Sequence, residues 1–215
     1  MGRNRDVSFA SDGLTLEGVL HLPDATPAPG LVVCHPHPQY GGDMWNNVVS
    51  VVCRTANESG VAALRFNFRG TGGSDGAYDV GRGEQGDAAA ALSYLRSLAE
   101  IDAGRVALAG YSFGAAMALR AAGDDRGLSA LIAVSLPTAG DWLREADVGC
   151  PALFLSGDRD EYSDPEELRR LAAGLGDRAE VTVIRGVDHF WAGAEDRLSE
   201  AVSDYLSRHL TARPR

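Results

Sequence analysis

The pattern of apolar and polar positions changes character along the chain. Residues 7–22 alternate apolar and polar side chains around Ser11-Asp12-Gly13, which is typical of an antiparallel β-hairpin. The run 31–34 is continuously apolar, as in a strand that is covered on both faces. Further periodic segments predict, in order, a helix at 44–56, a strand at 61–68, a helix at 81–99, a strand at 105–109, a helix at 113–122, strands at 128–135 and 151–155, a helix at 165–173, a strand at 181–184 and a helix at 195–210.

This regular alternation of strands and helices predicts the α/β fold class, as one domain over residues 1–215. We expect a mostly parallel sheet of about eight strands with an antiparallel first hairpin, helices on both faces and right-handed crossovers. Ligands of such sheets bind beyond the carboxyl ends of the strands, so reactive side chains are expected in the loops directly after each strand.

Composition and charge exclude several classes of function. The chain has 215 residues, of which 45% are hydrophobic, enough to bury a core. Its 20 basic residues are all arginine against 30 acidic ones, which gives a net charge of −10. Without lysine, Schiff-base chemistry and a phosphate-loop lysine are excluded. Without a basic stripe, we expect no nucleic-acid partner and no anionic membrane partner.

Cysteine usage and the N-terminal sequence bear on the compartment. Cys34, Cys53 and Cys150 are an odd number at wide spacing, which is typical of reduced thiols and not of a disulfide framework. The first residues lack the apolar core of a signal peptide, and no stretch approaches the length of a membrane span. We therefore expect a cytoplasmic protein.

The motif Gly-x-Ser-x-Gly, which places a serine on a tight turn between a strand and a helix, occurs twice. The copy at 110–114 follows a predicted strand and runs straight into a predicted helix. Ser112 is therefore the candidate nucleophile, with an ordinary helix-capping serine as the alternative. The copy at 72–76 lies in a glycine-rich loop that opens no helix, so we expect Ser74 to be structural.

Two other patterns indicate cofactors only when taken alone. The glycines at 81, 83 and 86 match the dinucleotide fingerprint, but the preceding strand ends about a dozen residues too early for that motif, and Glu84 would face the pyrophosphate. His35 and His37, with Asp43 nearby, could offer three metal ligands. Pro36 favours a turn between them, however, and no further ligand completes a familiar spacing. We expect neither a cofactor nor a metal.

A serine nucleophile needs an imidazole as its base and a carboxylate that orients the imidazole. Among the five histidines, His189 stands in the loop between the last predicted strand and the last helix, which is a strand-end position. The acid is expected after the strand at 151–155, where Asp164 is already explained as the cap of the next helix. The residues alone leave Asp158 and Asp160 as open alternatives.

These motifs, in the order Ser112, acid, His189, together with the glycine-rich loop at 67–74, resemble those of the α/β-hydrolase superfamily over nearly the whole chain. The resemblance implies an acid three residues after a strand-end glycine, which maps from Gly157 onto Asp160. More narrowly, segments 35–42, 65–70, 110–114 and 188–190 look like a small lidless group similar to dienelactone hydrolases. Those enzymes use a cysteine nucleophile where this chain has Ser112, so their substrate is not carried across.

The intermediate of acyl transfer needs two backbone N–H donors for its oxyanion. The residue after the nucleophile, Phe113, is the first expected donor. The second is expected in the loop after the third strand, where the prolines at 36 and 38 have no N–H, which favours His37. Tyr40 and Gly41 remain alternative donors.

Together these residues predict a serine hydrolase that cleaves carboxylic esters or related acyl compounds through an acyl-enzyme. The connection from Ser135 to Pro151 is too short for a cap domain, so we expect short, soluble substrates. Tyr40, Tyr111 and Trp142 are candidates for the pocket wall. A thioesterase, lactonase or peptidase with the same triad remains an alternative, as does a non-catalytic binding protein that keeps the fold.

Overall fold

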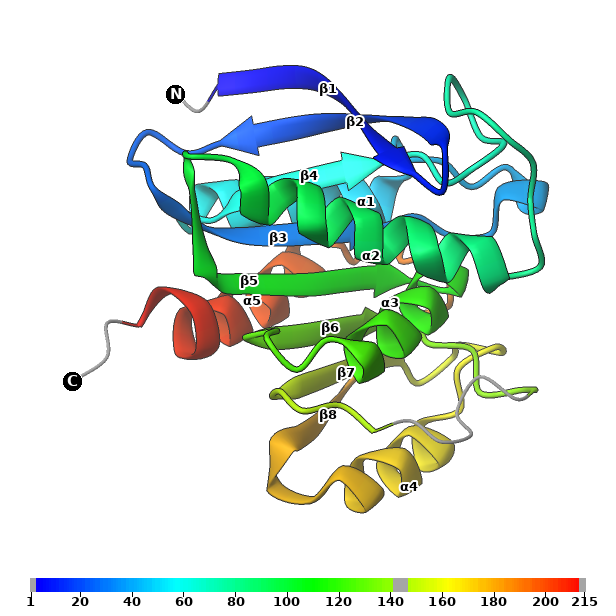
Figure 1. Ribbon diagram of the computed structural model, residues 1–215. Coiled ribbons are helices and arrows are strands. Elements are labelled where there is room, and N and C mark those ends of the chain that lie inside the picture. The colour runs from blue at the N-terminus through cyan, green and yellow to red at the C-terminus, as the bar shows by residue number, and fades with distance from the viewer. Residues whose placement is uncertain (1–2, 141–146, 213–215) are drawn as a thin grey trace.

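The computed structural model describes residues 3–140 and 147–212, and a twisted eight-stranded sheet runs through the middle of this part of the chain (Figure 1). The strand order is β1-β2-β4-β3-β5-β6-β7-β8. The strands are β1 (Arg3–Ser11), β2 (Leu14–Leu22), β3 (Ala28–Cys34), β4 (Ala62–Phe66), β5 (Ile101–Tyr111), β6 (Ala130–Val134), β7 (Ala152–Gly157) and β8 (Ala179–Ile184). The pairs β1–β2 and β2–β4 are antiparallel and all other pairs are parallel, which confirms the predicted fold class.

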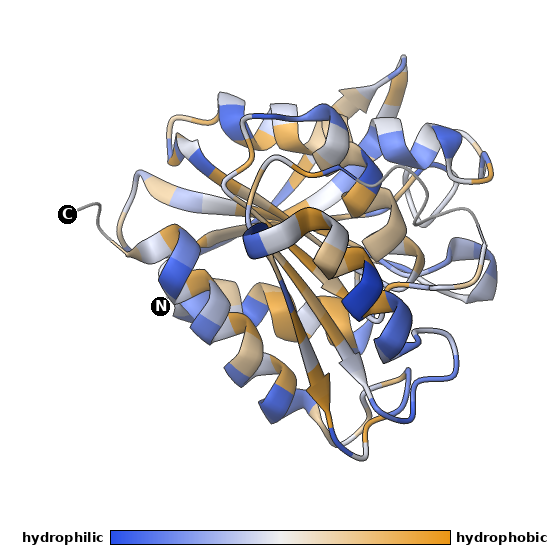
Figure 2. Cartoon of the chain, turned by 90° about the horizontal axis from the view of Figure 1, so that it is seen from below, coloured by the Kyte–Doolittle hydropathy of each residue, from blue (hydrophilic) through white to orange (hydrophobic). Residues whose placement is uncertain are grey.

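Helices cover both faces of the sheet, as expected for an α/β protein (Figure 1). Helices α1 (Asn47–Glu58) and α5 (Glu195–Leu206) pack on one face, and α2 (Arg82–Ser97), α3 (Phe113–Asp124) and α4 (Pro165–Leu175) pack on the other. Each face has its own apolar cluster, and Figure 2 shows the apolar strands enclosed between the two helix layers. The parallel strands are buried along most of their length, which explains why the sequence shows them as continuous apolar runs.

Several predicted boundaries were wrong, because strand pairing and helix capping determine where these elements begin and the apolar pattern does not show them. Strand β5 begins at Ile101 and not at 105, because Ile101 pairs with Ala28 at the start of β3. Helix α1 begins at Asn47 and not at 44, because the Asn46 side chain accepts the Val48 N–H and caps the helix. The predicted helix at 195–210 is two elements, since α5 ends at Leu206 and one π-helical turn follows at Ser207–Thr211.

The sheet places several loops beside one another. Strands β3 to β8 run in the same direction, so their carboxyl ends lie along one edge of the sheet (Figure 1). The loops after β3, β5, β7 and β8 therefore meet at this edge, although they come from distant parts of the sequence. Within the described residues, no helix is long and apolar enough to cross a membrane.

Candidate active site

Ser112 lies on the sharp turn between β5 and α3. Its backbone has φ of 54°, a left-handed conformation that is costly for a residue other than glycine and that often marks a functional site. A Cβ atom at Gly110 would collide with the Gly114 carbonyl, and one at Gly114 would collide with the Cys34 carbonyl. Both motif glycines are therefore required, because backbone atoms cannot move aside as flexible side chains do.

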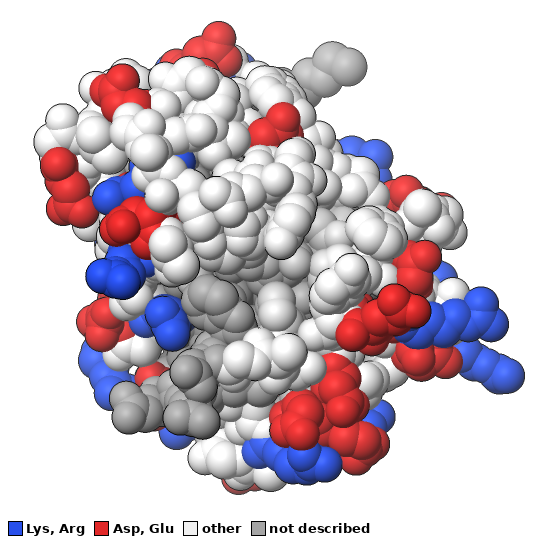
Figure 3. Space-filling model, turned by 90° about the vertical axis from the view of Figure 1, so that its right-hand side faces the viewer, with Lys and Arg blue, Asp and Glu red and all other residues white. Residues whose placement is uncertain are grey.

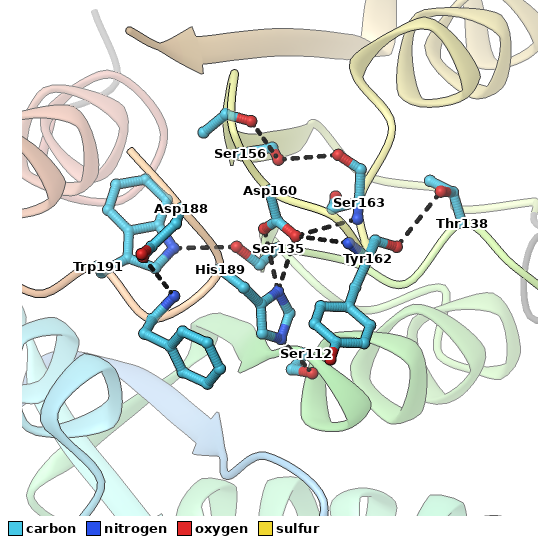
Figure 4. A network of polar contacts seen from close by, with 12 residues as sticks. Ser112, Ser135, Thr138, Ser156, Asp160, Tyr162, Ser163, Asp188, His189 and Trp191 are labelled. Carbon is cyan, nitrogen blue, oxygen red and sulfur yellow. Dashed lines mark hydrogen bonds and ion pairs between the residues drawn. The ribbon is translucent and has the colours of Figure 1, made fainter. Parts of the chain in front are cut away.

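The structure brings Ser112, His189 and Asp160 into one chain of hydrogen bonds (Figure 4). The Ser112 Oγ lies 3.0 Å from Nε2 of His189. On the other side of the ring, Nδ1 lies 2.9 Å and 3.0 Å from the two carboxylate oxygens of Asp160. Ser112 follows β5, His189 follows β8 and Asp160 follows β7, so all three lie at the carboxyl edge of the sheet. His189 and Asp160 are both buried, at 8% exposure. This geometry suits proton transfer between the serine and the imidazole.

The structure also separates the two acids that the residues alone left open. Asp160 faces His189, whereas the Asp158 carboxylate accepts the N–H of Gly186 in the neighbouring turn. Burial alone would raise the pKa of Asp160. Hydrogen bonds from the His189 and Ser135 side chains and from the Tyr162 N–H outweigh this effect and hold the pKa of Asp160 below its usual value. Asp160 is therefore a carboxylate near neutral pH.

A cavity of about 700 Å³ opens above Ser112. Two of the predicted wall residues, Tyr40 and Tyr111, line it, while Trp142 lies outside the described residues. Tyr162 and Phe190 also line it, although the sequence analysis did not single them out. The remaining lining residues are Pro36, His37, Gly41, Gly42, Asn46, Ser112, Phe113, Pro137 and His189. Tyr162 and Phe190 stand two residues after the acid and one after the histidine, and this closeness in sequence was the available signal.

Both expected oxyanion donors, Phe113 and His37, line the cavity with Ser112. The alternative donors are engaged elsewhere, because the N–H of Tyr40 donates to the His37 carbonyl and that of Gly41 to the Pro38 carbonyl. The His37 ring accepts the Gln39 N–H at Nδ1 and contacts the Tyr78 hydroxyl at 3.1 Å through Nε2. Burial lowers the pKa of His37, although the nearby Glu84 carboxylate acts in the opposite direction. The lowered pKa favours an uncharged ring.

His35, the other half of the candidate metal pair, is part of the core. Its Nε2 accepts the Phe68 N–H at 3.0 Å, and its Nδ1 lies 2.7 Å from the Pro36 carbonyl. Burial lowers the pKa of His35 to about 4, so the ring is neutral and both nitrogens are used within the fold. Across residues 3–140 and 147–212, no three His, Cys, Asp or Glu side chains are grouped so that they could hold a metal ion.

The remaining two motifs serve local structure. Ser74 is buried, and its hydroxyl donates to the Asn67 carbonyl at 2.7 Å and accepts the Glu17 N–H at 3.1 Å. In the segment that imitates a dinucleotide fingerprint, the Glu84 carboxylate accepts the N–H groups of Asp79 and Gly81. Those bonds cap the N-terminus of α2, where a negative charge is stabilising.

The mostly parallel sheet, with a serine on the turn between β5 and α3, defines an α/β hydrolase. Two solved structures agree with this class, each with a TM-score of 0.85 and 31% identity. One is an alpha-beta serine hydrolase homologue from Coxiella burnetii, and the match covers 94% of this chain and 97% of that chain. The other is XC6422 from Xanthomonas campestris, an a/b serine hydrolase without lid, and the match covers 99% of this chain and 97% of that chain. Residues 12–210 match the family described as X-Pro dipeptidyl-peptidase (S15 family), and the chain belongs to that family.

A curated relative shares the sequence over most of its length. The protein RP471 of Rickettsia prowazekii, described as uncharacterized, is 34% identical over 188 residues, which are 83% of this chain and 79% of that protein. These comparisons and the fold identify the chain as a hydrolase.

Proposed function

We propose that the protein is a serine hydrolase of short, uncharged carboxylic esters. The observation that carries the proposal is the continuous hydrogen-bonded chain from Asp160 through His189 to Ser112 at the base of an open cavity. In this mechanism Ser112 Oγ attacks the acyl carbon while its proton passes to Nε2 of His189. The N–H groups of Phe113 and His37 stabilise the oxyanion.

The second half of the reaction returns the enzyme to its starting state. The tetrahedral intermediate expels the alcohol, which takes the proton from His189, and an acyl group remains on Ser112. Water then attacks this acyl group while His189 accepts its proton. Collapse of the second intermediate releases the carboxylic acid and returns the proton to the serine. Throughout, Asp160 keeps Nδ1 protonated and stabilises the imidazolium.

The charge of the pocket supports an ester substrate over an X-Pro peptide. A dipeptidyl-peptidase substrate carries a free N-terminal ammonium, and a buried cation needs a carboxylate partner. Among its described residues the cavity is lined by no Asp, Glu or Arg. Figure 3 shows the carboxyl edge of the sheet, with charged side chains gathered toward the margins and uncharged ones at the centre. Three exposed aromatic residues at the mouth, Tyr40, Tyr162 and Phe190, add apolar surface that an uncharged acyl or alcohol group can contact.

The test compares three substrates under the same conditions. We expect phenyl acetate to be hydrolysed with the highest kcat/KM, and a free-amino X-Pro anilide and its N-acetylated form to react slowly and alike. A preference for the free-amino anilide that disappears on N-acetylation would contradict the ester proposal and assign the peptidase activity. If wild type and Ser112→Ala are equally inert toward all three substrates, the proposal is wrong and a binding protein with this fold is favoured.

A further inference from the structure

A buried hydrogen bond joins two residues next to the triad, and the reaction scheme above does not use it (Figure 4). Ser135 directly follows β6, and Trp191 stands two residues after His189. The indole Nε1–H of Trp191 donates to the Ser135 Oγ at 2.9 Å. Both residues are fully buried, and Trp191 is the largest side chain buried to this degree in the described structure. Solvent therefore cannot replace either partner.

Both residues adopt a backbone conformation that is unusual for their type. Ser135 has φ of 49° and Trp191 has φ of 61°, both in the left-handed region. Such conformations persist at non-glycine residues only where the surrounding structure holds them, and they cluster at functional sites. The N–H of Ser135 also donates to the Leu155 carbonyl at 2.7 Å, which fixes it to β7, the strand that leads to Asp160.

The donors and acceptors in this group determine the direction of the serine hydroxyl. An indole nitrogen only donates, so Ser135 Oγ accepts from Trp191 and its own proton must point to another acceptor. The Ser135 side chain is among the groups that lower the pKa of Asp160, which points to the Asp160 carboxylate as that acceptor. The Oδ1 atom of Asp160 also accepts the N–H groups of Tyr162 and Ser163, at 3.0 Å and 3.1 Å. The carboxylate is thus held by its own loop, and Ser135 acts on it from the end of β6.

We propose that Ser135 is a positioning residue, whose hydroxyl, oriented by Trp191, holds the Asp160 carboxylate against Nδ1 of His189. The consequence for turnover rests on the ester hydrolysis proposed above. The consequence for the Asp160–His189 hydrogen bond does not, because that bond exists without substrate. The two consequences are therefore measured separately.

Ser135→Ala removes the donor to Asp160 and leaves the Trp191 N–H unpaired. We expect kcat to fall about tenfold with KM unchanged, since one hydrogen bond to a charged group is lost and no substrate contact changes. Without this donor, the Asp160 carboxylate stabilises the protonated ring of His189 more strongly. The acidic limb of the kcat/KM profile therefore moves to higher pH. In NMR spectra without substrate, the Nδ1 proton signal of His189 moves. Trp191→Phe keeps the Ser135 hydroxyl and gives a smaller change of the same kind.

The matched control is Ser156→Ala. Ser156 is also fully buried, and its hydroxyl donates to the Ser163 and Gly157 carbonyls. Unlike Ser135, it is not among the groups that shift the pKa of Asp160. We expect this variant to lower Tm, while both the acidic limb and the Nδ1 proton signal stay at their wild-type positions. It separates the loss of a buried serine hydroxyl from the loss of the contact with Asp160.

The outcomes distinguish the two proposals. If Ser135→Ala lowers Tm as Ser156→Ala does but moves neither the acidic limb nor the Nδ1 signal, Ser135 is only structural and the inference is overturned. If wild type cleaves no ester, the proposed function fails, and the Nδ1 signal alone decides the role of Ser135. A shift in Ser135→Ala that is absent from Ser156→Ala supports the inference in either case.

Discussion

The same five-residue motif folds in two different ways in this protein. At 110–114 the glycines allow backbone to pass against backbone, and the serine stands on a strained turn beside His189. At 72–76 the serine has two hydrogen bonds within its own surroundings, and a Cβ at Gly72 or Gly76 would meet side chains and not backbone. The comparison shows that the motif gains chemical meaning only from the strand before it and the helix after it.

The two regions also differ in what surrounds the serine. The turn of Ser112 lies at the carboxyl edge of the sheet, where loops from three other strands reach it. The loop of Ser74 lies near the β1–β2 hairpin, and Asp75 accepts the Thr15 N–H. Ser74 is only 8% exposed, and it is not among the residues that line the cavity. A nucleophile needs an imidazole partner and access for substrate, and the structure gives both to one copy.

The largest expected effect comes from removing each serine hydroxyl in turn. Ser112→Ala lowers kcat for phenyl acetate by about 10⁵-fold or more, because the nucleophile is lost while the fold is kept. Ser74→Ala keeps kcat per folded molecule but lowers the free energy of unfolding by about 1–3 kcal/mol, since a buried carbonyl and N–H lose their partner. Ester turnover and urea unfolding of both variants check this, and the reverse assignment of effects would show that the other copy carries the chemistry.

The next effect concerns the acid that completes the Ser112 site. Asp160→Asn lowers kcat by about 10⁴-fold, since the amide no longer keeps Nδ1 of His189 protonated. Asp158→Asn changes kcat little, because Asp158 bonds the Gly186 N–H and not the imidazole. Steady-state kinetics of the two variants decide, with circular dichroism as the control for folding. Equal losses would leave the acid unassigned.

The acyl chain tests whether the site is as open as the structure indicates. The mouth residues Tyr40 and Phe190 are 88% and 63% exposed, so a long chain would stay largely in water. It would then gain little of the ~0.8 kcal/mol per CH₂ that full burial gives. We expect kcat/KM to be highest for acetyl and butyryl esters and about tenfold lower for octanoyl esters. An octanoyl preference, or a jump in rate above its solubility limit, would show that an apolar cover is present.

A last effect is on stability and arises next to the Ser74 region, where His35 accepts the Phe68 N–H. The pKa of His35 is about 4 in the fold and 6.5 when exposed, because burial disfavours the charged ring. Its contribution is complete above pH 6.5 and is lost as the pH falls toward 4, by about 3 kcal/mol. His35→Gln keeps an acceptor that does not titrate, so its unfolding free energy should fall less over this range. Urea unfolding at pH 7 and 4.5 checks this, with the more exposed His209→Gln as control; parallel losses in wild type and His35→Gln would contradict it.

The order of elements was readable from the sequence because buried parallel strands and amphipathic helices have different periods. The ends of elements were not. Residues 102–105 of β5 are at least partly exposed and have no partner in β3, which pairs with Ile101 and again from Val106 onward. The residues from 44 onward fit helical spacing, but the Asn46 cap places the start of α1 at Asn47. Both features depend on contacts that hydropathy does not encode.

Within the site, the sequence indicated the residues with motifs and missed those without. Ser112 and His189 stand at strand ends, and the structure brings them together as the motif order requires. Asp160 was separated from Asp158 only by resemblance, because the direction of a loop carboxylate is set by its backbone. Ser135 and Trp191 had no motif at all, since their relevance depends on a hydrogen bond between residues that are 56 positions apart.

The most direct test of the central claim is labelling with a fluorophosphonate probe, followed by mass spectrometry of the labelled peptide. Such probes react with a serine hydroxyl that an imidazole activates. We expect one label per chain, on Ser112, with labelling lost in His189→Ala and retained in Ser74→Ala. A label on Ser74, or no label on a folded protein, would contradict the claim that the copy of the motif at 110–114 carries the nucleophile.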